Sequence, residues 1–155
     1  MSAKWFYFGF VVLYLVHMHE EYWTGFTKKL PPPRLVGIFA DRGFWVLNPL
    51  LLSLATAVGV ANLMGASWAF FWVALWSSIC FWNAVGHGIW SLATRNYQPG
   101  LITGLTYAPL FVIWTLMLKN QTNSDWHFYS LALLIGFGIT VILTSFAYFG
   151  RRVLQ

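Results

Sequence analysis

Long apolar stretches and short polar segments alternate along the chain. Five apolar stretches each approach the ~20 residues that a helix needs to cross the hydrocarbon core of a bilayer. The predicted helices cover residues 5–23, 44–64, 68–92, 101–118 and 128–149. No repeat and no long linker divides them. The pattern therefore predicts an all-α fold, a polytopic membrane helical bundle with five transmembrane helices, as a single domain over residues 1–155.

The segments between these stretches contain residues that end helices. Three consecutive prolines at positions 31–33 cannot continue the first helix. Gly65 is placed for a tight turn between the second and third helices. Pro99 and Gly100 interrupt the chain before the fourth, and Gly100 is expected to adopt a positive φ. A polar loop at 120–127 precedes the fifth helix.

The composition supports a lipid environment. Apolar residues make up 59% of the chain and charged residues only 8%, whereas a soluble domain has roughly 25% charged residues. The net charge of +5 is spread over the helix ends without a basic patch, which argues against nucleic-acid binding. Cys80 is the single cysteine and excludes both an internal disulfide and a cysteine-based zinc site. No small-residue cleavage site follows the N-terminus, so we expect the first helix to be retained.

The basic residues predict an orientation. With five spans, seven of the nine fall on the side that holds the first loop, the third loop and the C-terminus. These seven are Lys28, Lys29, Arg34, Arg42, Arg95, Arg151 and Arg152, whereas Lys4 and Lys119 fall on the other side. The positive-inside rule then places the N-terminus outside and the C-terminus in the cytoplasm, as in a prokaryotic inner membrane.

Ionisable residues inside two predicted helices are the strongest functional signal. Each costs roughly 2.5–3.5 kcal/mol to insert near the centre of a bilayer, so such groups usually face the protein interior and have a function. His17, Glu20 and Glu21 are related as i, i+3 and i+4 and share one face of the first helix. Asn83 and His87 are related as i and i+4 on the third.

Counting from the helix ends places these groups at one depth. Glu20 precedes Lys28 by eight positions and His87 precedes Arg95 by eight, so both lie about 12 Å below the same face. His19 points away from the cluster. Polar residues of the other three helices are predicted to lie in the same layer, namely Asn48, Thr103, Thr106, Tyr107, Thr144 and Ser145. We therefore expect all five helices to contribute to one polar layer.

Two kinds of chemistry fit this cluster. His17, Glu20, Glu21 and His87 could ligate a divalent metal, since imidazole and carboxylate suit zinc, iron or manganese. The same groups could instead carry out acid–base catalysis without a metal. An ion or proton pathway would need polar groups across the whole bilayer, and the outer half is too apolar. A purely structural role, as hydrogen bonds between helices, is disfavoured by the cost of inserting four ionisable groups.

Residues around the cluster are candidates for binding a substrate. They are Asn48, Trp90, Arg95, Tyr97 and Tyr107. Trp82 and Trp90 flank His87 and would form the wall of an apolar pocket. Arg95 either reaches a carboxylate or a lipid headgroup or serves only as a topology anchor.

Four short motifs appear in order along the chain. They are His17-Met18-His19-Glu20-Glu21, Phe44-Trp45-Val46-Leu47-Asn48, Asn83-Ala84-Val85-Gly86-His87 and Thr94-Arg95-Asn96-Tyr97-Gln98-Pro99-Gly100. With these motifs the chain resembles a family of small integral membrane proteins known as HXXEE-domain proteins, over about residues 10–115. Thr24 stands near a position where the family often has proline. The resemblance implies functional roles for the cluster residues but supplies no reaction.

The preferred hypothesis is a membrane-embedded enzyme of the hydrolase, isomerase or cyclase type that acts on a lipophilic small molecule. Its catalytic residues would be His17, Glu20, Glu21 and His87, with Asn83 and Asn48 orienting them. The alternative is a non-catalytic subunit that binds haem or a chlorophyll-type pigment in a larger membrane complex. A homo-oligomer is compatible with either hypothesis.

Overall fold

A computed structural model describes residues 2–26, 41–122 and 125–149 of the chain. These residues contain five long α-helices and no strand: α1 (Ala3–Trp23), α3 (Asp41–Leu63), α4 (Ser67–Thr94), α5 (Leu101–Thr122) and α6 (Trp126–Phe149). The predicted all-α class and the five predicted helices are therefore confirmed. The prolines at 31–33 and the basic residues Lys28, Lys29, Arg34, Arg151 and Arg152 lie outside the described residues.

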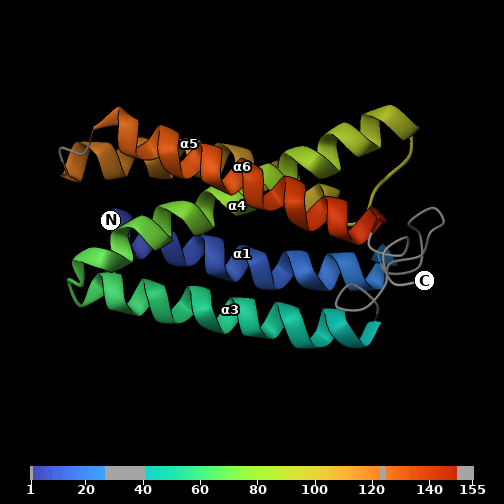
Figure 1. Ribbon diagram of the computed structural model, residues 1–155, viewed down its shortest axis with the longest axis horizontal. Coiled ribbons are helices and arrows are strands. Elements are labelled where there is room, and N and C mark those ends of the chain that lie inside the picture. Colours follow the sequence, from blue (N-terminus) through green and yellow to red (C-terminus); the bar gives the residue numbers. More distant parts are fainter. Residues whose placement is uncertain (1, 27–40, 123–124, 150–155) are drawn as a thin grey trace.

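The five helices run alternately back and forth and form an elongated bundle (Figure 1). The α4 helix occupies the centre and packs against α3, α5 and α6, with a smaller contact to α1. The α1 helix packs against both α3 and α5. As a result, the C-terminal part of α1, the C-terminal part of α4 and the start of α5 meet at one end of the bundle (Figure 1).

Within the described residues, four helices are long and apolar enough to cross a membrane, namely Phe44–Leu63, Ser67–Thr94, Leu101–Gln121 and Trp126–Ser145. The sequence predicted five spans, and α1 is the difference. It has 21 residues but is not among these four helices, and it carries Lys4, two histidines and two glutamates. It nevertheless lies alongside α3 and α5 within the bundle (Figure 1).

Large apolar side chains cover the outside of the bundle. Val46 and Leu50 on α3 are 70% and 63% exposed, and Leu134 on α6 is 68% exposed. Water would make such a surface unfavourable, whereas lipid tails solvate it. The length of the helices, their composition and this surface together indicate an integral membrane protein.

Aromatic side chains fill the interior between α1 and α5. Phe10, Tyr107 and Trp114 are each at most 1% exposed. The Phe10 ring stacks on the Tyr107 ring, with 6.1 Å between the ring centroids, and packs edge to face with the Trp114 ring, with 5.8 Å between the centroids. Tyr107 also packs against the His17 ring, with 5.7 Å between the ring centroids, so this packing holds α1 against α5 directly next to His17.

Small residues let α4 approach its neighbours. A Cβ atom on Gly104 of α5 would lie 3.5 Å from Cα of Ala84 on α4, so the two backbones come close there. Glycine and alanine at a crossing point are typical of helix pairs in membranes. Because Gly104 follows Thr103 and Ala84 follows Asn83, this contact brings the polar residues of the two helices to the same place.

Two glycine turns lie where the sequence predicted them, whereas one loop is shorter than predicted. Gly65 and Gly100 have φ values of +87° and +84°, as expected for the turns that they form. The polar loop predicted at 120–127 is shorter, because α5 continues to Thr122 and α6 begins at Trp126. Asn120 therefore lies within α5 rather than ending it.

Candidate functional site

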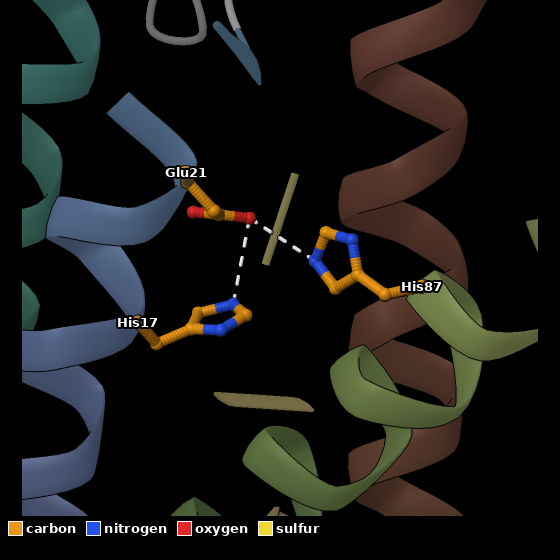
Figure 2. A group of neighbouring side chains, drawn as sticks. All are labelled: His17, Glu21 and His87. Atoms are coloured by element: carbon orange, nitrogen blue, oxygen red, sulfur yellow. Dashed lines mark ion pairs between the residues drawn. The ribbon is translucent and has the colours of Figure 1, made fainter. Parts of the chain in front are cut away.

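His17, Glu21 and His87 point toward one another from α1 and α4 (Figure 2). Glu21 Oε1 lies 3.4 Å from His17 Nε2 and 3.1 Å from His87 Nε2. One ligand atom of each residue lies within 4.8 Å of the other two. The side chains are 1%, 9% and 10% exposed respectively. We refer to these three residues as the His–Glu cluster.

The spacing along α1 explains half of this geometry. His17 and Glu21 are one helical turn apart, so their side chains extend from the same face. The third member, His87, comes from α4 and arrives through the packing of the two helices. The rings of His87 and Phe26 also pack edge to face, with 6.2 Å between their centroids. Phe26 follows the C-terminal end of α1 and covers His87 on that side.

Asn83 lies between the two imidazoles. Its Nδ2 is 3.0 Å from His17 Nε2 and 3.4 Å from His87 Nε2. The predicted i, i+4 pair of Asn83 and His87 therefore faces the cluster. An amide group at this position holds both rings in a defined orientation.

Glu20 has a different place from its neighbour. Its Oε1 accepts a hydrogen bond from the backbone N–H of Ile102 at 3.0 Å, and its Oε2 accepts one from that of Thr103 at 2.8 Å. These donors belong to the first turn of α5, which has no partners for them within the helix. Glu20 also accepts hydrogen bonds from the Thr103 hydroxyl, at 2.5 Å, and from the Tyr97 hydroxyl.

Glu20 was predicted as a metal ligand, and the structure separates it from the other three residues. Successive residues of an α-helix are rotated by about 100°, so Glu20 and Glu21 cannot both face α4. Glu21 faces α4, and Glu20 faces the start of α5. Among the described residues, the group that could hold a metal ion contains His17, Glu21 and His87 only.

Thr103 joins the two parts of the site. Its hydroxyl lies 2.6 Å from His17 Nδ1 and 2.5 Å from Glu20 Oε2. The side chain is 8% exposed. The sequence placed Thr103 in the polar layer without a role, because nothing in the pattern shows which side chain of α5 meets α1.

Gly100 covers the cluster with its backbone. It has a φ of +84°, and a Cβ atom there would lie 2.6 Å from His17 Cε1 and 3.1 Å from Glu21 Cγ. Glycine is therefore required at position 100 for two reasons: the backbone has a positive φ, and a side chain would collide with His17. The sequence predicted the conformation but not the contact with His17.

The candidate substrate-binding residues lie at different distances from the cluster. Tyr107 is buried against the His17 ring, and Tyr97 reaches Glu20. Asn48 accepts a hydrogen bond from the Tyr14 hydroxyl at 2.5 Å and donates to the carbonyl of Phe44, so its amide group bonds to residues outside the cluster.

Arg95 and Trp90 follow His87 toward the end of α4. Arg95 is exposed and adopts a left-handed conformation with a φ of 53° where α4 ends. Trp90 is half-buried.

The α6 helix does not take part in the site as expected. Thr144, which was predicted to lie in the polar layer, is exposed, and α6 packs mainly against α4. Thr144 therefore does not belong to a buried polar layer, whereas Ser145, the other residue predicted for it on α6, is half-buried. Depth along a helix can be counted from the sequence, but the direction of a side chain around the helix axis depends on its packing. His19, by contrast, was predicted to point away from the cluster; it is exposed, and its Nδ1 pairs with the carbonyl of Leu15.

Tyr97 lies outside the helices, in the loop between α4 and α5. Burial, and then the hydrogen bond to Glu20 and its charge, raise the pKa of this phenol to about 12. The Tyr97 phenol is therefore neutral at physiological pH, and its hydroxyl donates a hydrogen bond to the Glu20 carboxylate.

The fold and the site define a multi-pass helical membrane protein with a buried His–Glu cluster between its first helix and α4. The chain belongs to the family described as "protein of unknown function with HXXEE motif", whose sequence model matches residues 8–118. The matched segment contains every residue of the cluster together with Glu20 and Thr103. No curated protein and no solved structure matches the chain significantly.

Proposed function

We propose that this protein is a membrane-embedded enzyme that binds a divalent metal ion at His17, Glu21 and His87 and acts on a lipophilic substrate. The observation that carries the proposal is the convergence of three ligand atoms from two helices within 4.8 Å in a buried position. Ionisable groups at such a place are costly to insert and are retained mainly for function.

The donor set suits a catalytic metal. Two imidazole nitrogens and one carboxylate form the ligand sets of many catalytic zinc sites and of non-haem iron sites. Three protein ligands leave a position for water or a substrate oxygen. Zinc, iron and manganese all fit these donors, and a bound cation would polarise a carbonyl or lower the pKa of its water. The chemistry that this supports is hydrolysis, isomerisation or cyclisation.

Access from the membrane supports a lipophilic substrate. Large apolar side chains cover the outside of the bundle, and the His87 side chain is itself 10% exposed. A substrate dissolved in the bilayer would approach the cluster at His87. On the side of the α4–α5 loop, the backbone of Gly100 packs directly on His17 and covers the cluster.

The orientation that we propose places the cluster near the cytoplasmic face of a prokaryotic inner membrane. Arg95 follows α4 at the end of the bundle where the cluster lies, and basic loops stay on the cytoplasmic side. This orientation puts the N-terminus outside and the C-terminus in the cytoplasm. A reporter domain that is active only in the cytoplasm, fused after the C-terminus, should be active, and an inactive but inserted fusion would reverse the orientation.

The experiment compares lipid products made by purified variants. Wild-type protein loaded with Zn²⁺, Fe²⁺ or Mn²⁺ is incubated with a lipid extract of the host membrane, and products are followed by mass spectrometry. Glu21→Gln and His87→Gln should lower the rate by on the order of 100-fold or more, as expected for loss of a catalytic group.

His19→Gln is the matched control, because this histidine lies on the same helix with an exposed ring. It should keep the wild-type rate. If no metal-loaded wild-type sample forms a product that the His87→Gln sample lacks, the enzymatic proposal fails. Visible absorbance in the purified protein would instead favour a haem- or pigment-binding subunit.

A further inference from the structure

The hydroxyl of Thr103 lies between an imidazole nitrogen and a carboxylate. It is 2.6 Å from His17 Nδ1 and 2.5 Å from Glu20 Oε2. A longer contact of 3.4 Å reaches the carbonyl of Gly100. Two short contacts on one hydroxyl determine where its proton and that of the imidazole lie.

Glu20 acts only as an acceptor here. Four donors approach its two carboxylate oxygens: the backbone N–H groups of Ile102 and Thr103 and the hydroxyls of Thr103 and Tyr97. A carboxylate that receives four donors is ionised and has no proton to give. The single proton of the Thr103 hydroxyl must therefore lie on the Glu20 side.

The oxygen of Thr103 is then free only to accept from His17. A hydroxyl has one proton and two lone pairs, so a second short contact must be filled by a donor. The donor is the N–H group at His17 Nδ1. In the neutral ring, Nε2 consequently carries a lone pair instead of a proton.

Asn83 supports this assignment from the other side of the ring. Its Nδ2, an N–H donor, lies 3.0 Å from His17 Nε2. A donor at this distance needs an acceptor, which Nε2 is only when it is unprotonated. The contacts of Thr103 at Nδ1 and of Asn83 at Nε2 therefore agree on one tautomer, and Asn83 Nδ2, at 3.0 Å, is closer to Nε2 than Glu21 Oε1 is, at 3.4 Å.

We propose that Glu20 and Thr103 form a positioning relay that holds His17 in the Nδ1–H tautomer and directs the lone pair of Nε2 toward Glu21 and His87. Metal-binding histidines usually donate their other ring N–H to an acceptor, which fixes the tautomer and increases the basicity of the ligand. Here the acceptor is a carboxylate reached through one hydroxyl. The purpose of the relay rests on the proposed metal site, but its protonation pattern does not.

The relay gives Glu20 and Glu21 different roles, since only Glu21 lies in the His–Glu cluster. Glu21 would contact the metal, and Glu20 acts on His17 through Thr103. Thr103 is held for this role because its own backbone N–H also bonds to Glu20 Oε2 at 2.8 Å.

The experiment uses Thr103→Val, which removes the hydroxyl and keeps the shape, and Thr103→Ser, which keeps the hydroxyl. The full-length protein is labelled with ¹⁵N in detergent micelles without metal. Long-range ¹H–¹⁵N correlations of the imidazoles report the tautomer, and His17→Gln assigns the His17 signals. Affinity for Zn²⁺ alone is then measured by calorimetry, and thermal unfolding shows whether each variant is folded.

We expect wild type and Thr103→Ser to show the proton of His17 on Nδ1. In Thr103→Val this preference should be lost, and the affinity for Zn²⁺ should fall by roughly 10- to 100-fold, as for other outer-shell partners of metal-binding histidines. The variant should remain folded, because valine has nearly the shape of threonine.

Two results would overturn the relay. One is a proton on Nε2 of His17 in the wild-type protein, in a neutral or a charged ring. The other is a folded Thr103→Val protein with the wild-type tautomer. If the wild type shows the expected tautomer, Thr103→Val loses it and neither protein binds Zn²⁺, the relay is supported and the metal proposal alone fails.

Discussion

Glu20 and Glu21 are adjacent on α1, and their carboxylates face different helices. The sequence identified both as members of a functional cluster, because i+3 and i+4 positions lie on one side of a helix relative to His17. It could not separate their roles, since the rotation of α1 about its axis is set by contacts with α4 and α5. The same limit applies to Asn48, which lies at the predicted depth but bonds to Tyr14.

Gly100 gives a prediction at the scale of a single residue. Gly100→Ala adds a Cβ atom 2.6 Å from His17 Cε1 in a backbone with a φ of +84°. The left-handed backbone alone costs about 1–2 kcal/mol for a residue with a side chain. We expect a larger loss of unfolding free energy than this, measured by denaturant titration in micelles, together with weaker metal binding.

Gly65→Ala is the matched control for this prediction. Gly65 has a φ of +87°, but nothing lies within 4 Å of its Cβ position. It should show only the backbone cost and should leave metal binding unchanged. Equal effects of the two substitutions would show that Gly100 does not press on His17.

At the scale of elements, the start of α5 is completed by a residue of α1. Glu20 accepts the N–H groups of Ile102 and Thr103, which makes it an N-terminal cap supplied by another helix. Its negative charge is also favourable at the positive end of the helix dipole. The sequence predicted that α5 begins at residue 101 from the Pro-Gly break, but a cap from a distant segment leaves no local signal.

Glu20→Ala should therefore destabilise α5 as well as change the site. Loss of a cap costs about 0.5–2 kcal/mol, and we expect a decrease of this size in the unfolding free energy. Hydrogen exchange should increase at the amides of residues 102 and 103 in particular. Glu20→Gln keeps an acceptor oxygen and should lose less stability. If Glu20→Ala matches the wild type in both measurements, Glu20 does not cap α5.

At the scale of the whole molecule, the sequence predicted the architecture more accurately than it predicted the contacts between helices. Runs of apolar residues define helices in membranes strongly, because every backbone polar group must be paired within the helix. The helix positions were therefore predicted closely. The α6 helix shows what the pattern lacks: Thr144 has the expected depth, yet it is exposed because α6 joins the bundle through α4.

The family match shows which part of the chain is shared with the family, but it does not indicate a reaction. The HXXEE match covers residues 8–118 and so includes α3, α4 and most of α1 and α5, where the site lies. The matched segment thus includes the whole His–Glu cluster, while the family description gives no reaction.

The metal content of the purified protein tests this account most directly. Elemental analysis is carried out on wild type, Glu21→Gln, His87→Gln and the control His19→Gln after purification without added metal or chelator. The account predicts stoichiometric zinc, iron or manganese in wild type and His19→Gln, and its loss in the two cluster variants. A folded wild-type protein without transition metal, or equal metal content in all four proteins, would contradict it.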